Sequence, residues 1–506
     1  MLTLRSLKAF PALVIGATAW PAIAKLPARA QAAPRFEESP CPFKAEAQVL
    51  AQFRCGHVAV PENRALANGR QLKIAVAILA SLSPASRPDP IVMLAGGPGL
   101  RAIDLAVGSL SRGGLDVLRA DRAVILYDQR GTGYSAPAFC PDVQIAVDPL
   151  VEARAADPRA LRRAALARCG DAMRSMGWDL SQYNSAVSAL DLEDLRRALG
   201  YQQWNLHGRS YGTRLALHAM RLAPHGIRSA VLDGPLPPNR SSWFNRPADF
   251  ADALHRLSAA CAAQPACNAA YPSVEPTFWQ RARELQREPQ VVQAMRPDGT
   301  PDTLRVTRSL LVGIVYEMQS RALIPIVPML IHEVRNDTVT QVVSRQLLAQ
   351  ASSTSAMISW GLHYTVNCFE EAPLNTPELQ AQLRRAHPTA FELGDVFPQP
   401  NMCDGLHAFR AASAHLAPVV SDIPTLIFTG EFDIATHRLN GPFVARALRN
   451  SRVVEIPGAG HAESLQHECT RNITRGFVND PQHAVDTSCL AGIPPLRFIT
   501  DIRAIR

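Results

Sequence analysis

The chain has 506 residues, of which 47% are hydrophobic and 19% charged, and it carries a formal net charge of +8. These values are typical of globular proteins and argue against wholesale disorder. The length is sufficient for one large domain with an insertion. No dense basic run with interleaved aromatic residues occurs, so nucleic acid is a poor candidate partner.

The N-terminus has the features of an export leader. A positively charged segment precedes an apolar stretch at 9–24, which is broken by prolines and too short to predict a membrane span. Small-x-small motifs predict cleavage after Ala24 or after Ala32, and we favour the second, so that residues 1–32 form a signal peptide. An uncleaved anchor is the alternative. Cleavage predicts a secreted or periplasmic protein with no stable membrane span.

Short apolar runs bounded by turn residues alternate with amphipathic helices along much of the chain. Strands are predicted at 72–80, 91–94, 123–127, 204–206, 230–233, 425–429 and 453–456, and helices at 188–199 and 213–222. This alternation predicts an α/β fold with a mostly parallel sheet and helices on both faces.

The pattern changes between 236 and 419. Helical segments rich in alanine and arginine dominate there, with prolines between them and no clear pair of buried strands. We interpret 236–419 as a helical cap inserted into an α/β core made of 33–235 and 420–506. Such a cap would cover the active site and exclude water from it.

A glycine-rich turn at 95–99, with the sequence AGGPG, follows the predicted strand at 91–94. Bare backbone N–H groups in such a turn are suited to hold a developing negative oxygen, as an oxyanion hole does. Pro98 has no N–H group, so Gly97 is the favoured donor and Gly96 the second choice. A simple tight turn is one alternative. A phosphate-binding loop is another, although neither a Walker lysine nor a G-x-G-x-x-G spacing is present.

The segment 128–135 follows the predicted strand at 123–127 and begins with a polar turn. Asp128 and Arg130 are candidates for a buried ion pair that braces the oxyanion loop, because groups that act on substrate need supporting contacts. We interpret this segment as structural rather than catalytic.

The segment 208–212, with the sequence GRSYG, lies between a predicted strand and a predicted helix. This is the context of a nucleophile elbow, in which a sharp turn lifts a serine hydroxyl clear of the sheet. Flanking glycines are needed because a Cβ would collide with neighbouring backbone. We predict Ser210 as the nucleophile and the N–H group of Tyr211 as the second oxyanion donor.

Acid and histidine candidates follow in the order that this architecture uses, which is serine, acid, histidine. Asp433 comes just after the strand at 425–429, and His461 follows the strand at 453–456. A serine hydroxyl needs an adjacent base, and a carboxylate fixes the tautomer of that base. We predict His461 as general base and then acid, and Asp433 as the carboxylate that orients it. Glu431 is the rival acid, and two ordinary loop residues are the alternative.

Ten cysteines form an even set. In an exported protein they predict disulfides, for which sequential pairing is favoured although sequence alone does not prove connectivity. The sequential pairs are Cys41–Cys55, Cys140–Cys169, Cys261–Cys267, Cys368–Cys403 and Cys469–Cys489. Metal binding is the alternative, but no paired C-x-x-C or H-E-x-x-H spacing occurs, and we expect no metal and no cofactor. His57, His437 and His467 are therefore interpreted as surface or packing residues.

Taken together, these motifs resemble the α/β-hydrolase peptidases of the prolyl aminopeptidase and tripeptidyl aminopeptidase family. The matching motifs are GGPG at 96–99, DQRGTGYS at 128–135, GRSYGT at 208–213, GEFD at 430–433 and GH at 460–461. The chain length and the segment NCFEE at 367–371 are more similar to the secreted tripeptidyl (TAP-like) branch. Ala95 stands where the prolyl enzymes carry histidine, which weakens any inference of strict proline specificity.

The resemblance implies an α/β-hydrolase fold and an exported serine aminopeptidase that releases N-terminal residues or tripeptides. It also implies that Glu370 and Glu371 of the cap bind the substrate ammonium group, with solvated cap acids as the alternative. A carboxylesterase or lactone hydrolase on the same scaffold is the second reading of the function, and a non-catalytic binding protein is the third. The expected partner is a peptide or a small acyl substrate, and the oligomeric state stays open.

Overall fold

The computed structural model describes residues 34–501, apart from 111–113, 138, 149–150, 152–154, 156, 296–300, 337–352, 354, 395, 398–399 and 407–409. The predicted leader, residues 1–32, and its cleavage sites lie outside the described residues. Among the helices that are described, none has both the length and the hydropathy that a bilayer crossing requires.

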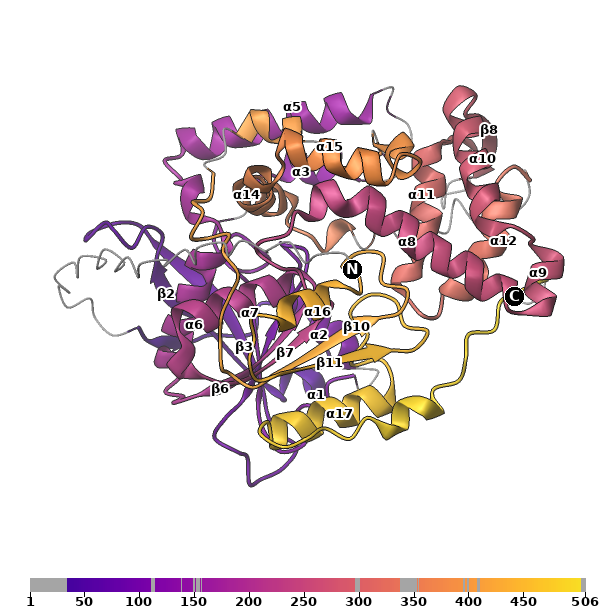
Figure 1. Ribbon diagram of the computed structural model, residues 1–506. Coiled ribbons are helices and arrows are strands. Elements are labelled where there is room, and N and C mark those ends of the chain that lie inside the picture. The colour runs from indigo at the N-terminus through magenta and orange to yellow at the C-terminus, as the bar shows by residue number, and fades with distance from the viewer. Residues whose placement is uncertain are drawn as a thin grey trace, which may run out of the picture. The chain divides into compact units, whose positions relative to one another are not determined.

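A nine-stranded sheet runs through the centre of the fold, in the order β1-β2-β3-β5-β4-β6-β7-β10-β11 (Figure 1). Strands β5, β4, β6, β7, β10 and β11 pair in parallel, whereas β1, β2 and β3 are antiparallel at one edge. The predicted α/β class with a mostly parallel sheet is therefore confirmed. The strands are β1 Phe36–Glu38, β2 Phe53–Pro61, β3 Gln71–Leu79, β4 Ile91–Leu94, β5 Val124–Tyr127, β6 Trp204–Arg209, β7 Ile227–Asp233, β10 Thr425–Gly430 and β11 Ser451–Ile456.

Each strand predicted from the sequence is present, but β1 and β2 were not predicted. Strand β2 buries Val58 and Val60, while Ala59 between them is exposed and His57 before them is only partly buried. This alternation is typical of a strand with one solvated face, and it gives a weaker signal than the continuous apolar runs of the parallel strands.

Helices cover both faces of the sheet because successive side chains of each buried strand point to opposite sides. In β5, Ile125 belongs to the apolar cluster that contains residues of α6 (Ser185–Ala198) and α7 (Tyr211–Leu222). Its neighbour Val124 belongs to the cluster that contains residues of α2 (Ala102–Leu110) and α17 (Glu468–Asn479). Two short helices complete the core, α1 Ala47–Leu50 and α16 Asn440–Ala445.

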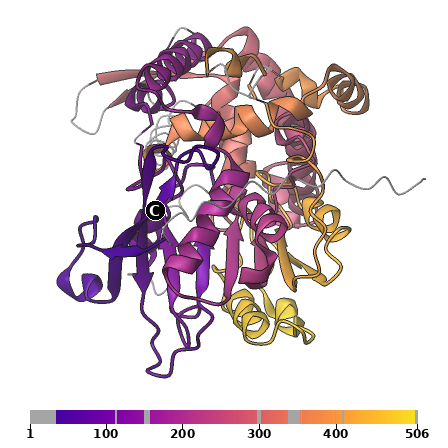
Figure 2. The same ribbon diagram turned by 90° about the vertical axis from the view of Figure 1, so that its left-hand side faces the viewer.

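Between β7 and β10 the chain is mainly helical, and both views show this region at the end of the fold opposite to α17 (Figure 1 and Figure 2). The expectation that it lacks paired strands is wrong, because β8 (Gln290–Met295) and β9 (Pro301–Val306) form an antiparallel pair. The turn-type sequence Pro297-Asp298-Gly299 between them was the available signal. The helices of this region are α8 Ser242–Ala262, α9 Pro265–Ala270, α10 Val274–Arg287, α11 Arg308–Tyr316, α12 Val327–Glu333, α14 Trp360–Glu370 and α15 Pro377–Ala386.

Two helices from the first part of the core also pack against the helical region. Helix α3 (Pro141–Ala146) contacts α14, and α5 (Pro158–Ser175) contacts the short 3₁₀ helix η7 (Pro400–Leu406). The helical region that covers the sheet is therefore larger than the predicted cap at 236–419.

The sequential disulfide pairing is confirmed in the structure. Every bridge has a Cα–Cα separation between 5.0 and 5.7 Å, within the usual range for disulfides. The bridges are Cys41–Cys55, Cys140–Cys169, Cys261–Cys267, Cys368–Cys403 and Cys469–Cys489.

Candidate active site

The predicted catalytic residues follow the carboxyl ends of parallel strands. Ser210 comes directly after β6, Asp433 follows β10, and His461 follows β11. The glycine-rich turn follows β4, which pairs directly with β6. Because the carboxyl ends of parallel strands share one edge of the sheet, the topology brings all these segments to the same rim.

Ser210 occupies a strained backbone conformation, with φ 55° and ψ −123°. Its N–H group donates to the carbonyl of Asp233 at the end of β7, at 2.8 Å. A Cβ on Gly208 would lie 2.6 Å from the carbonyl oxygen of Gly212, and one on Gly212 would lie 2.0 Å from that of Leu94. Both glycines are therefore required by close backbone approach, as the nucleophile-elbow interpretation predicts.

The imidazole of His461 is held by Asp433. Its Nδ1 lies 2.9 Å from Oδ2 and 3.0 Å from Oδ1 of the carboxylate. Since an ionised carboxylate only accepts hydrogen bonds, Nδ1 is the donor and Nε2 is left as the basic nitrogen. The N–H group of His461 also donates to the carbonyl of Gln319, at 2.7 Å, which fixes the backbone beside the ring.

Asp433 is completely enclosed by donors. Its Oδ1 accepts from the N–H groups of Ala435 and Thr436, at 2.9 and 2.8 Å, and its Oδ2 accepts from the hydroxyl of Thr436, at 2.9 Å. These bonds stabilise the ionised carboxylate and fix its plane against the imidazole. Sequence reasoning did not find Thr436, although a hydroxyl residue three positions after a candidate acid was the available signal.

The turn that follows β7 connects the serine and histidine positions. Ser210 bonds to Asp233, and the next residue, Gly234, is so close to His461 that a Cβ on it would lie 3.2 Å from the ring Cε1. Gly234 has φ +68°, a conformation that favours glycine. Ser210 and His461 therefore lie against the same two-residue turn.

The rival acid, Glu431, is directed elsewhere. Its Oε2 accepts from the N–H group of Gly458 at 2.7 Å, which fastens the loop after β11 to the end of β10. The structure thus brings Asp433 to the imidazole of His461 and gives Glu431 a bracing contact.

The glycine-rich turn lies beside the serine. A Cβ on Gly96 would be 3.0 Å from the Cβ of Ser210, and Gly97 has φ +109°. Tyr211 is the first residue of α7, so its N–H group belongs to the helix turn that lacks intrahelical acceptors. The placement suits Gly97 and Tyr211 as oxyanion donors, and this role stays a prediction.

Helix α14 supports the glycine-rich turn from the cap side. Nδ1 of His363 donates to the carbonyl of Pro98 at 3.0 Å, and its Nε2 accepts from Asn367 at 3.0 Å. Burial lowers the pKa of His363 to about 4, so the ring is neutral at pH 7 and this tautomer is fixed.

The predicted ion pair between Asp128 and Arg130 is wrong. Arg130 instead makes a bidentate pair with Asp191 of α6, at 2.6 and 2.7 Å. Asp128 accepts from the N–H groups of Ile103 at 3.2 Å and Tyr134 at 2.9 Å, and burial raises its pKa to about 6. Because Ile103 lies at the start of α2, just after the glycine-rich turn, Asp128 still braces that turn, but through backbone bonds.

Glu370 and Glu371 are buried, with residue exposures of 1% and 0%. Both face Arg214 of α7: its Nη1 lies 3.4 Å from Glu370 and its Nη2 lies 2.6 Å from Glu371. Glu370 also accepts from the N–H group of Ser185 at 2.7 Å, and Glu371 from that of Ser242 at 2.8 Å. Both carboxylates thus have partners of their own, and an ammonium group would have to compete with Arg214. Their amine-binding role stays a prediction, but the alternative that they are solvated is wrong.

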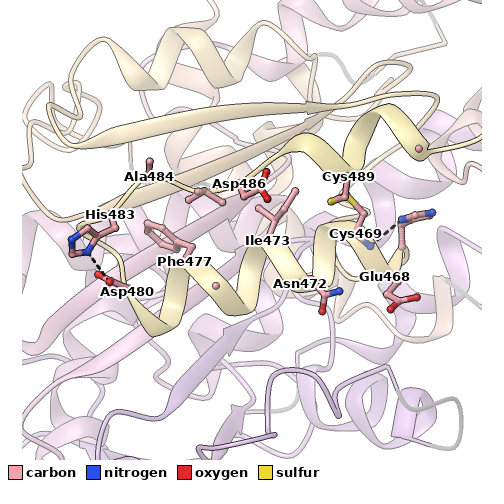
Figure 3. A pocket seen from close by; sticks show the side chains of 14 residues that line it. Glu468, Cys469, Asn472, Ile473, Phe477, Asp480, His483, Ala484, Asp486 and Cys489 are labelled. Atoms are coloured by element: carbon pink, nitrogen blue, oxygen red, sulfur yellow. Dashed lines mark hydrogen bonds and ion pairs between the residues drawn. A yellow bond between two sulfur atoms is a disulfide. The ribbon is translucent and has the colours of Figure 1, made fainter.

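A cavity of about 720 Å³ opens beside His461. Core, cap and C-terminal segments all contribute to its wall, including Arg209, Arg321 and Leu496. A second cavity of about 670 Å³ lies between α17 and the following segment, which the Cys469–Cys489 bridge ties to the helix (Figure 3). None of the residues that line this second cavity belongs to the predicted site.

Comparison with known families gives two matches. The alpha/beta hydrolase fold family matches residues 89–260, which include the glycine-rich turn and the elbow, and the TAP-like protein family matches residues 392–489, which include Asp433 and His461.

Curated relatives with several activities are similar to parts of the chain. Tripeptidyl aminopeptidase of Streptomyces coelicolor is 31% identical over 200 residues, or 38% of this chain and 37% of the relative. Carboxylesterase B of Mycobacterium tuberculosis is 30% identical over 263 residues, half of each chain (50% and 50%). Serine protease Hip1 of the same organism is 26% identical over 223 residues, 42% of each. The matches span half or less of these relatives.

Among solved structures, proline iminopeptidase of Mycobacterium smegmatis matches with 14% identity and a TM-score of 0.37, covering 84% of this chain and 98% of that chain. This likeness is too weak to add to the assignment, which rests on the sheet order and the two family matches. The chain belongs to the TAP-like α/β hydrolases.

Proposed function

We propose that this protein is an exported serine hydrolase that acts through an acyl-enzyme on Ser210. His461 Nε2 would take the hydroxyl proton as Ser210 attacks the substrate carbonyl and would later return it to the leaving group. Asp433 would stabilise the imidazolium that forms. The observation that carries the proposal is the bond from His461 Nδ1 to Asp433, 2.9 Å long, beside the turn that also binds Ser210.

The developing negative oxygen would be held by the N–H groups of Gly97 and Tyr211. The removal of one such donor typically costs about 2.7–4 kcal/mol of transition-state stabilisation. Positive φ at Gly97 and the first-turn position of Tyr211 support these two donors.

An aminopeptidase is the activity that we favour. The support is the TAP-like match over 392–489 and the likeness to a tripeptidyl aminopeptidase. A carboxylesterase is the second candidate, since a relative named carboxylesterase B matches half of this chain (50%). Recognition of the substrate ammonium by Glu370 and Glu371 is part of the aminopeptidase proposal.

Export is supported by the cysteine chemistry. All ten cysteines form disulfides, which persist in oxidising compartments such as the periplasm or the exterior of the cell. We therefore propose a secreted or periplasmic location.

The decisive experiment combines active-site labelling with a substrate panel. A fluorophosphonate should label the wild type and a Ser175→Ala control, which alters the exposed last residue of α5, but not Ser210→Ala. Aminoacyl and tripeptidyl anilides should then be hydrolysed by the wild type and by Ser175→Ala but not by Ser210→Ala, beside short p-nitrophenyl esters that either candidate enzyme cleaves. Label on Ser210→Ala would refute the nucleophile, and ester turnover without anilide turnover would favour the carboxylesterase.

A further inference from the structure

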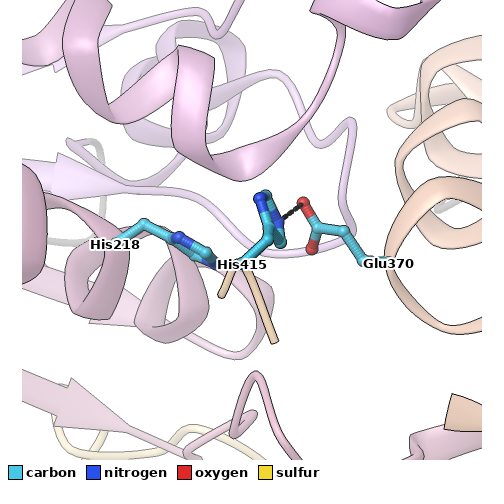
Figure 4. A group of neighbouring side chains, drawn as sticks. All are labelled: His218, Glu370 and His415. Carbon is cyan, nitrogen blue, oxygen red and sulfur yellow. Dashed lines mark ion pairs between the residues drawn. The ribbon is translucent and has the colours of Figure 1, made fainter. Parts of the chain in front are cut away.

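Three side chains from distant parts of the chain converge beside α7. His218 lies in α7, Glu370 is the last residue of α14, and His415 lies in the segment that leads to β10 (Figure 4). One ligand atom of each lies within 4.8 Å of the other two. We propose that these residues form a binding site for a divalent transition-metal ion of the zinc type. The metal site does not depend on the proposed hydrolase function, and with a metal bound to Glu370 the substrate ammonium group is left to Glu371.

The spacing of the ligand atoms suits a small tetrahedral ion. His415 Nε2 lies 3.3 Å from Glu370 Oε1. A tetrahedron with metal–ligand bonds of about 2.0–2.1 Å has edges of about 3.4 Å, so this pair already has the required separation. The other ligand atoms lie within 4.8 Å of one another, so these edges exceed the tetrahedral value by at most about 1.4 Å.

Neither imidazole nitrogen that faces the cluster has a hydrogen-bond partner among the described residues. Nε2 of His218, on a residue that is 1% exposed, is buried and unpartnered. Nε2 of His415 is likewise without a hydrogen bond, because its contact with Glu370 lacks the required geometry. A buried nitrogen without a partner is unfavourable, and a metal ion would satisfy both nitrogens at once.

The guanidinium groups around the cluster favour Glu371 over Glu370. Arg214 faces both carboxylates, whereas Arg246 also interacts with the charge of Glu371. The tighter contact of Arg214 is with Glu371, at 2.6 Å against 3.4 Å for Glu370. Glu370 is therefore the carboxylate whose charge is left to a further cation. Two imidazoles and one carboxylate form a donor set typical of Zn²⁺.

A bound ion would join three segments that the sequence separates widely. It would tie the helix that follows the elbow to α14 and to the segment before β10, and so would hold the cap against the core. His415, with a side chain that is 11% exposed, is the least buried of the three ligands.

The test uses the full chain without a polyhistidine tag, stripped with a chelator and returned to chelator-free buffer. Zn²⁺ is titrated in competition with a chromophoric chelator, Co²⁺ binding is followed by visible absorption, and Tm is measured with and without Zn²⁺. We expect one Zn²⁺ per chain, a Co²⁺ spectrum of the tetrahedral type and a higher Tm with Zn²⁺. His415→Gln should lower the Zn²⁺ affinity by at least about 100-fold.

His437→Gln is the matched control, because His437 lies 2.9 Å from Asp252 and 3.9 Å from Asp249 and is thus another histidine beside carboxylates. It should keep the Zn²⁺ affinity of the wild type. Equal affinity in His415→Gln and the wild type, or equal loss in both variants, would overturn the proposal. If the cluster binds a proton and no metal, Zn²⁺ will not change Tm, and this result would also overturn the proposal. X-ray absorption of the wild-type Zn²⁺ complex needs no variant, and a ligand shell without two imidazoles would have the same consequence.

Discussion

Gly234→Ala is a sensitive test of the proposed site, because it adds one methyl group beside the imidazole. The new Cβ would lie 2.8 Å from the hydroxyl of Thr436, 3.2 Å from Cε1 of His461 and 3.3 Å from Oδ2 of Asp433. Ordinary contacts are about 3.5–4.0 Å, so the ring and the hydroxyl must move by several tenths of an ångström. A misplacement of about 1 Å costs on the order of 100-fold in rate, so a movement of several tenths of an ångström should lower kcat by about 10-fold.

The same substitution also has a backbone cost, which a matched variant isolates. Gly234 has φ +68° and Gly200 has φ +77°, but a Cβ on Gly200 would meet nothing within 4 Å. Each alanine should therefore lower the free energy of unfolding by about 1–2 kcal/mol, measured by urea denaturation. Only Gly234→Ala should lose kcat on a peptide anilide. If its kcat stays within about twofold of that of Gly200→Ala, the proposed position of His461 beside this turn is refuted.

Three further predictions test other parts of the site. Asp433→Asn should lower kcat by about 10⁴-fold, because the amide favours the wrong imidazole tautomer, whereas Glu431→Gln should stay within about twofold of the wild type; steady-state kinetics of both would expose a reversed assignment. The pKa of His363 is about 4 in the folded protein and about 6.5 when unfolded, so the unfolded chain binds the extra proton between these values and stability falls as pH drops. Protonation of His363 in the unfolded chain should lower the free energy of unfolding by about 2 kcal/mol between pH 7 and pH 5. His363→Gln, which keeps an N–H donor, should lose about 2 kcal/mol less over this pH range, as measured by urea unfolding. Glu370→Gln and Glu371→Gln should raise KM for free-amine peptides far more than for acetylated ones, and equal effects on both peptides would remove the amine-binding role.

Local signals explain why much of the fold could be predicted. The strands at 91–94 and 425–429 are dense apolar runs closed by turn residues, and burial on both faces makes such runs distinctive. The elbow was recognisable because the close backbone approach that requires glycine at 208 and 212 arises within the same five residues, from Gly208 to Gly212. Sequential disulfides were also predictable, since each closes a stretch of chain with a sequence separation of 35 or less.

Contacts between distant segments were not predictable in the same way. Arg130 pairs with Asp191 rather than with the nearby Asp128, because α6 packs against β2 and brings the carboxylate of Asp191 to the guanidinium. His218 and His415 meet only after α7 and the segment before β10 are packed together. The spacing of residues along the sequence does not predict such packing, because it depends on helix orientation and on the volumes of the side chains between the two segments.

The contacts around Arg214 limit how the cap can move. Arg214 is 0% exposed, and its guanidinium faces Glu370 and Glu371. Movement of the cap away from α7 would therefore leave a buried charge without its partners. Loss of one partner from a buried ion pair typically costs about 3–5 kcal/mol, which is a large part of the stability of a domain. The cap is therefore anchored at this point and does not act as a lid that opens as a whole. Substrate access is then expected at the cavity beside His461, where core, cap and C-terminal segments meet without such an ion pair among the described residues that line it.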